Sequence, residues 1–196
     1  MSKVSRLASI SYELNIDKEN KLKKITSYLF NGIPFSRYGD KHIIKGSEVI
    51  DSHVWTIIDA IKRPDIAILL DIFETEYCCL WNGKSAENYS YYAPYLVKLK
   101  LEHPFTNWLF DNSIENPIGI YLRSRLSLNE LSYQLRKFNQ VFDEETNSWL
   151  MFRYYDPLTV KKLLPYLPVK DYIQFMDNIL FILADDIKSN QILILQ

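Results

Sequence analysis

Glycine, cysteine and histidine are all scarce in this sequence. Its 5 glycines are scattered over 196 residues, and none lies in a loop pattern that cradles phosphate groups. The two cysteines, Cys78 and Cys79, are adjacent in an apolar run, which favours buried free thiols over a disulfide or a metal site. The three histidines, His42, His53 and His103, are too widely spaced to suggest metal ligation. We therefore expect no metal, no cofactor and no catalytic residues of a standard kind.

An excess of charge and long apolar runs are lacking too. Because 23 Lys and Arg nearly balance 24 Asp and Glu, the net charge is -1, and there is no overall field to attract nucleic acid or an anionic membrane. No apolar run reaches the ~18 residues that a membrane-spanning helix needs. The N-terminal apolar stretch is too short and broken for a secretory signal. These features predict a cytoplasmic protein that binds neither nucleic acid nor a membrane.

The first fifty residues differ from the rest, because they are rich in lysine and hold most of the glycine-containing turns. Leu22, Ile25 and Leu29 share one face of a predicted helix, and the glycines of 37–46 then break the pattern. We expect residues 1–50 to form an N-terminal extension or small lobe and residues 51–196 to form the main domain. Within the main domain, a sheet part is expected to about residue 155, followed by a helical part with the terminal strands.

From residue 53 onward, short apolar runs alternate with helical patterns. Strands are predicted at 53–60, 77–81, 95–101, 117–124, 140–143, 148–155, 179–186 and 191–196. Helices are predicted at 63–73, 103–112, 128–138, 157–167 and 169–178. This order predicts a mixed α/β (α+β) fold, with a central mixed sheet of about five to seven strands, helices packed on it and a smaller helical C-terminal part.

Two helix starts are marked by capping residues. Ser127 and Glu130 have the spacing of a capping box, so a helix should begin at residue 128. Asp156 is suited to be an N-cap, and Pro157 to be the first residue of the helix that follows. The abrupt Asp-Pro after an apolar run is therefore interpreted as the start of a helix.

The residue pattern along three strands predicts how each is placed. Strand 95–101 alternates lysine with apolar residues, which predicts one face in water. Strand 148–155 is apolar on both faces, which predicts an interior position. The apolar tail 191–196 is β-prone and cannot lie bare in water without inviting association, so it marks a candidate edge for strand addition.

Acidic and tyrosine clusters are two candidate functional features. Residues 143–145 lie at a predicted hairpin tip and 185–186 at a strand end, where solvated acids are more usual than catalytic ones. A tyrosine cluster follows Glu87, and because tyrosine suits recognition surfaces as well as cores, we expect half of its rings to be buried. Its members are Tyr89, Tyr91, Tyr92 and Tyr95.

Arginines are the third candidate feature: Arg123, Arg125, Arg136 and Arg153. If Arg123 and Arg153 lie in neighbouring strands, their guanidinium groups form a fork-shaped receptor for carboxylates. The alternative is that they make ion pairs, with Asp156 or Asp111, that tie elements together.

The run from Leu122 to Pro168 has Arg-Ser before the capped helix, Leu-Arg inside it and Phe-Arg-Tyr-Tyr-Asp-Pro at the end of the hairpin. In these motifs and their order, the second half of the sequence resembles the bacterial type VI secretion effector-adaptor family, also called effector chaperones and long catalogued as a domain of unknown function. Looser similarity extends from Val54 to Asp186. Gln134 and Leu158 depart from the family pattern, which often has His and usually Arg there.

The resemblance implies an adaptor that is not an enzyme. Family members bind a toxic effector in the producing cell and help load it onto the valine-glycine repeat spike protein, so an effector and the spike are the expected partners. The residues we expect to contact partners are Tyr89, Tyr91, Tyr92, Arg123, Arg136, Arg153 and Asp156. The rival hypotheses are a hydrolase or nuclease that uses Asp, Glu and Arg, and an immunity protein that blocks a toxin.

Overall fold

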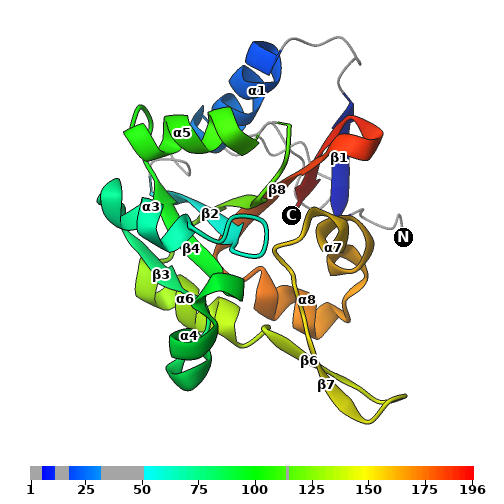
Figure 1. Cartoon of the computed structure of the whole chain (residues 1–196). Coiled ribbons are helices and arrows are strands. Elements are labelled where there is room, and N and C mark those ends of the chain that lie inside the picture. The colour runs from blue at the N-terminus through cyan, green and yellow to red at the C-terminus, as the bar shows by residue number, and fades with distance from the viewer. Residues whose placement is uncertain (1–5, 12–17, 32–50, 114) are drawn as a thin grey trace.

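The computed structural model describes residues 6–11, 18–31, 51–113 and 115–196. They form a seven-stranded sheet with the order β1-β9-β8-β5-β2-β4-β3 and a separate two-stranded ribbon, β6-β7 (Figure 1). The strands of the sheet are β1 Leu7–Ser11, β2 His53–Asp59, β3 Tyr77–Cys79, β4 Pro94–Leu99, β5 Gly119–Ser124, β8 Ile179–Asp186 and β9 Gln191–Leu195. The ribbon consists of β6 Gln140–Asp143 and β7 Ser148–Met151.

The predicted fold class and strand number are confirmed, although every pair in the sheet is antiparallel. The α-helices are α1 Lys18–Asn31, α3 Ile66–Ile72, α4 Gly83–Tyr89, α5 Pro104–Ser113, α6 Leu128–Arg136, α7 Pro157–Lys162 and α8 Val169–Phe175. Short 3-10 turns occur at η1 Ser90–Tyr92, η2 Leu164–Tyr166 and η3 Ile187–Ser189. No helix within these described ranges is long and apolar enough to cross a membrane.

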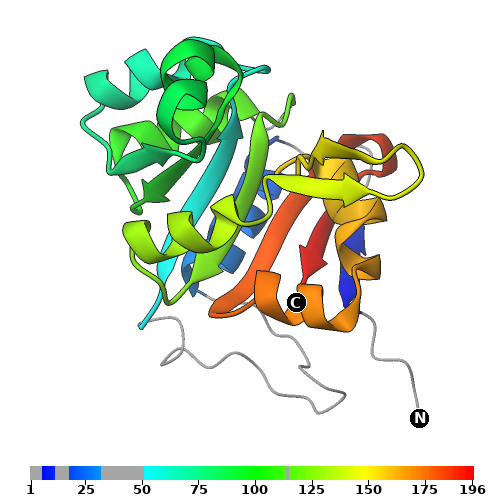
Figure 2. The ribbon, with the colours of Figure 1, turned by 90° about the horizontal axis from the view of Figure 1, so that it is seen from below.

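Helices cover both faces of the sheet, so its central strands are apolar on both sides. On β2, Val54 and Ile58 join a core cluster with residues of α1, α3 and α5, whereas Trp55 and Ile57 join a second cluster with residues of α6, α7 and α8. In Figure 2, α6 and α8 lie in front of the sheet and α1 lies behind it. The result is a three-layer α/β/α arrangement.

Two segments before residue 50 contribute to this arrangement. β1 pairs with β9 along its length, and α1 buries Ile25 and Leu29 in the first core cluster, as the helical pattern predicted. The break predicted at 37–46, with His42 in it, lies outside the described residues. A domain boundary near residue 50 stays a prediction.

The capping predictions are confirmed. Ser127 Oγ accepts a hydrogen bond from the Glu130 backbone N–H, and the Glu130 carboxylate accepts one from the Ser127 backbone N–H. Asp156 Oδ1 accepts a hydrogen bond from the Leu158 backbone N–H at 2.8 Å, and Pro157 is the first residue of α7.

The predicted wet face of strand 95–101 is wrong. β4 lies between β2 and β3, and Leu96 is fully buried in the second core cluster, while Val97 is buried in the first. Lys98 stays half-buried with its Nζ 5.5 Å from the centre of the Trp55 ring and 3.0 Å from a Glu76 carboxylate oxygen. An amphipathic lysine covers apolar surface in this way while its charge keeps a partner.

The predicted interior strand at 148–155 is also wrong. Its first half, β7, pairs with β6 alone among the described residues, and the ribbon projects from the body of the molecule (Figure 1). Trp149, Leu150 and Met151 are 66%, 46% and 48% exposed, whereas Tyr154 and Tyr155 turn into the core. A two-faced apolar pattern cannot tell a strand that the chain itself covers from one that it leaves open.

The tail 191–196 is a strand, as predicted, but it does not offer an edge. β9 is paired on one side with β1 and on the other with β8. Strand addition beside β9 is therefore excluded, because the hydrogen-bonding groups on both of its sides are engaged.

Candidate functional site

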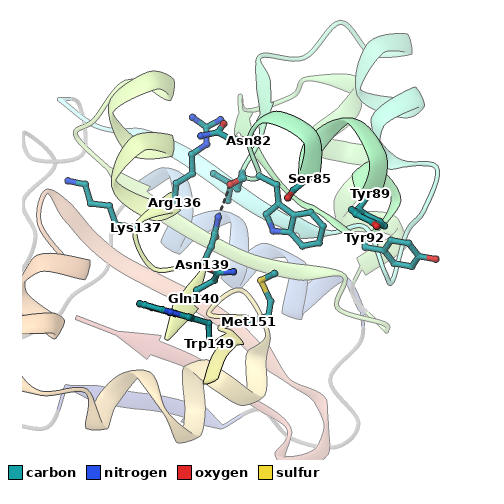
Figure 3. Close-up of a pocket in the computed structure, with 12 residues that line it drawn as sticks. Asn82, Ser85, Tyr89, Tyr92, Arg136, Lys137, Asn139, Gln140, Trp149 and Met151 are labelled. Carbon is teal, nitrogen blue, oxygen red and sulfur yellow. Dashed lines mark hydrogen bonds between the residues drawn. The ribbon is translucent and has the colours of Figure 1, made fainter. Parts of the chain in front are cut away.

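A groove of about 590 Å³ lies between α4-η1, the C-terminal end of α6 and the β6-β7 ribbon. We call it the aromatic groove. The residues that line it are Leu80, Trp81, Asn82, Ser85, Tyr89, Tyr92, Arg136, Lys137, Asn139, Gln140, Trp149 and Met151. In the view of Figure 3, Tyr89 and Tyr92 lie at one side and Arg136 and Lys137 at the other, with Trp149 and Met151 below.

The ribbon forms one wall of the aromatic groove. Gln140 pairs with Met151 and Phe142 with Trp149, so these four side chains share one face of the ribbon. The rings of Phe142 and Trp149 meet edge to face, with their centroids 5.4 Å apart. This face is a preformed apolar platform.

The tyrosine cluster forms the opposite side. Tyr89, Tyr91 and Tyr92 are 56%, 62% and 55% exposed, and only Tyr95 is buried, so the expected even split is wrong. Tyr89 and Tyr92 line the groove, whereas Tyr91 is exposed beside it. Tyr95 lies in β4, where its hydroxyl donates to the Ser90 carbonyl at 3.2 Å and ties η1 to the sheet.

The end of α6 joins the groove to the sheet. Arg136 Nη2 donates to the Cys79 carbonyl at 2.7 Å, and Asn139 Nδ2 donates to the Leu80 carbonyl at 2.8 Å. Cys78 and Cys79 are free thiols, as expected, but they are partly rather than fully buried; this partial burial raises the pKa of both. These contacts fix α6 against β3, so Arg136 is held in place by the backbone that it contacts.

Arg153 and Asp156 lie in a second, charged cluster. Arg153 Nη2 pairs with the Asp59 carboxylate, which is almost fully buried, and lies 4.0 Å from Asp156 Oδ2. Burial alone would lower the pKa of Arg153, but the Asp59 carboxylate outweighs it and raises that pKa. Asp156 and Lys161 also line a pocket of about 340 Å³. Arg153 is therefore held in an ion pair, as the alternative predicted, but its main partner is Asp59 and not Asp156 or Asp111.

Arg123 is not part of either site. Its side chain lies on the face of the sheet that α1 covers, where Nη1 donates to the Leu29 carbonyl and Nε donates to Ser52 Oγ at 2.7 Å. Burial lowers the pKa of Arg123 to about 10. The expected fork of Arg123 and Arg153 is not formed, because Arg153 follows the ribbon and pairs with the far end of β2.

The acidic clusters behave differently from each other. Asp143 lies at the ribbon's tip, where a hydrogen bond from Thr146 lowers its pKa. Asp185 was expected to be solvated, but it is 7% exposed and paired with Lys21 of α1. Asp186 accepts from Lys161 Nζ at 2.6 Å. Nowhere in the described ranges do three His, Cys, Asp or Glu side chains group so as to hold a metal ion.

Trp81, Trp149 and Met151 line the aromatic groove but were not among the predicted site residues. The available signal was the apolar run at 148–155, which we interpreted as core. A strand that is apolar on both faces and follows a polar hairpin turn is also what an exposed recognition ribbon looks like.

The fold and the aromatic groove together define a three-layer α/β protein with a groove lined by aromatic and basic side chains. Residues 54–172 match a family model described as Domain of unknown function (DUF4123), and the chain belongs to this family. The groove, which runs from Leu80 to Met151 in the sequence, lies entirely within the matched part. The comparisons with curated proteins and with solved structures gave no match.

Proposed function

We propose that this protein is a cytoplasmic adaptor of the bacterial type VI secretion system. It binds a secreted effector and helps load the effector onto the valine-glycine repeat spike protein, by recognition alone and without making or breaking a covalent bond. The sequence resemblance carried by residues 122–168 supports this role, and that run lies within the family match.

The exposure of aromatic side chains on facing walls of one groove carries the proposal. Trp149 is 66% exposed, and Tyr89 and Tyr92 are more than half exposed. Leaving such rings in water forgoes the free energy of their burial, whereas a partner that covers them gains it. Tyrosine and tryptophan also give large contact areas for little loss of side-chain entropy, which is why they dominate binding hot spots.

The ribbon supports the same role. Within the part of the chain that the structure describes, β6 and β7 pair with no other strand, so each has an outer edge to which a further strand can add. A partner segment can add there as a further strand while its side chains enter the groove.

The test is co-expression with the products of the neighbouring effector and spike genes, followed by pull-down and by an assay of effector solubility. The wild-type chain should retain both partners, and the effector should become soluble only in its presence. Trp149→Ala and Tyr92→Ala should lose the effector or the spike, whereas Tyr166→Ala, at a ring that is even more exposed but lies outside the groove, should not.

Three results would argue against an adaptor. The first is retention of neither partner. The second is turnover of a small molecule or nucleic acid by the purified chain that disappears when one carboxylate is neutralised, which would indicate an enzyme. The third is inhibition of the effector's toxicity without its transfer to the spike, which would indicate an immunity protein.

A further inference from the structure

The charged side chains of the aromatic groove are all of one sign. Arg136 and Lys137 line it, and none of its 12 lining residues is Asp or Glu. The chain as a whole has a net charge of -1, so the groove is a local cationic site on a nearly neutral molecule. A cationic site with low-dielectric aromatic walls concentrates anionic groups.

Two groove residues also have a hydrogen-bond donor without an acceptor. Trp81 Nε1 and Arg136 Nε are both buried, and neither has an acceptor among the described residues. The partial positive charge of such a donor is not neutralised by a partner, which adds to the cationic character of the groove. Lys137 is exposed, and its Nζ lies 4.3 Å from the centre of the Tyr133 ring.

We infer that the aromatic groove recognises an acidic segment of polypeptide. An Asp or Glu side chain of the segment lies against Arg136 and Lys137. Apolar side chains next to it in the segment lie against Tyr92, Trp149 and Met151. This inference rests on the proposed function and names the chemistry of the partner segment.

A polypeptide fits the groove better than a nucleic acid does. Two cations cannot follow a phosphate backbone, whose binding is dominated by many Lys and Arg contacts and requires a basic patch. The exposed Met151 and the apolar ribbon face suit aliphatic side chains, and free ribbon edges suit main-chain pairing.

The test begins with a phage-displayed random peptide library selected on the immobilised full chain. Phage that also bind Trp149→Ala are removed, so that the retained peptides depend on the groove. The peptides should be enriched in Asp or Glu next to aromatic or aliphatic residues. A selected set without such acids overturns the inference, and so does a failure to select any groove-dependent peptide.

The leading peptide is then made with an amidated C-terminus and a fluorescein label, alongside its isosteric Asn/Gln form. By fluorescence anisotropy, the amide form should bind at least about tenfold more weakly, because hydrogen bonds to charged groups are the stronger ones. Added salt should weaken the acidic form more than the amide form. Equal binding of the two forms would refute the role of the carboxylate, as would binding that requires a free C-terminus.

Charge reversal provides the matched pair of variants. Lys137→Glu reverses a groove cation directly after α6 and should weaken the acidic peptide by about tenfold or more. Lys162→Glu reverses an exposed cation at the end of α7, outside the groove, and should bind the peptide like the wild type. Circular dichroism checks that both variants fold. Unchanged binding by Lys137→Glu contradicts the inference, and so does stronger binding of a labelled oligo-dT strand than of the acidic peptide.

The two proposals fail in distinguishable ways. If the effector and spike are retained through Trp149 but neither Lys137→Glu nor salt affects them, the adaptor role stands and acidic recognition is wrong. If the acidic peptide shows the expected preferences but neither secretion partner is retained, the groove chemistry stands and the adaptor role is wrong.

Discussion

Replacing Arg123 with methionine should destabilise the fold and leave partner binding intact. Arg123 is 5% exposed, and its guanidinium clamps α1 to β5, because Nη1 donates to the Leu29 carbonyl while Nε and Nη2 donate to Ser52. Leu29 lies in the last turn of α1, where carbonyls lack partners within the helix. Methionine keeps the apolar stem of the side chain but removes all of these donors.

The expected loss of folding stability in Arg123→Met combines free-energy contributions of opposite sign. Hydrogen bonds from a charged donor contribute about 1.5–3 kcal/mol, and a carbonyl left buried without a partner costs about 1–3 kcal/mol. Relief from burying the guanidinium offsets part of this, since burial is what lowers the pKa of Arg123. We expect a net loss of about 2–3 kcal/mol, which for a chain of this size lowers Tm by roughly 4–12 °C.

Urea unfolding followed by tryptophan fluorescence measures the loss, and pull-down of the secretion partners at low temperature measures binding. The control is Lys170→Met, at an exposed cation on α8, which should stay within about 0.5 kcal/mol of the wild type. If Arg123→Met is as stable as that control, the clamp does not contribute. If Arg123→Met folds normally but no longer binds its partners, Arg123 is a recognition residue after all.

Three further outcomes are expected. Burial raises the pKa of Tyr121 to about 12. Between pH 10 and 12 the unfolded chain therefore loses a proton that the folded chain keeps. The free energy of unfolding should fall as the pH rises through this range, by up to about 2–3 kcal/mol. Tyr121→Phe should reduce that fall, measured by urea unfolding at pH 8 and pH 11; an unchanged slope would refute it. Ser127→Ala removes the capping box of α6 and should cost about 1 kcal/mol in the same assay at neutral pH, whereas Ser127→Asp, which can still cap, should not. Trp149→Ala should change the free energy of unfolding by less than about 0.5 kcal/mol, and a larger loss would mean that the ring supports the ribbon itself.

Local features of the fold were predictable because their causes are local. The capping box at Ser127 and the Asp156-Pro157 start are satisfied within one helical turn of the chain, so their residues appear together in the sequence. The apolar runs that became β2, β5 and β8 likewise carry the β-branched and aromatic residues that fit a buried strand.

The two wrong strand predictions concern whether another segment covers the faces of the strand. The strand at 95–101 was assigned a wet face because its lysines alternate, but β3 pairs beside it and Lys98 reaches across Trp55. The strand at 148–155 was assigned to the interior because both faces are apolar, yet β7 stands outside the sheet. In both cases burial depends on whether another segment packs against the strand, which the strand's own residues do not specify.

The predicted site residues also include some that the structure brings together and one that it places elsewhere. Tyr89, Tyr92 and Arg136 were identified from the kinds of residue they are, and they do meet in one groove. Arg123 was grouped with them by proximity in sequence, but β5 directs it to the opposite layer, toward α1.

The sequence alone determined the class of fold, the starts of α6 and α7, and the near neutrality of the chain, because propensity, capping and charge are properties of short segments. Only the tertiary structure decided that β9 lies between β1 and β8, that Arg123 clamps α1 to β5, and that the ribbon and the tyrosine cluster face each other across a groove. Burial depends on which distant segments pack together, and the alternation of residues along one strand does not specify those segments.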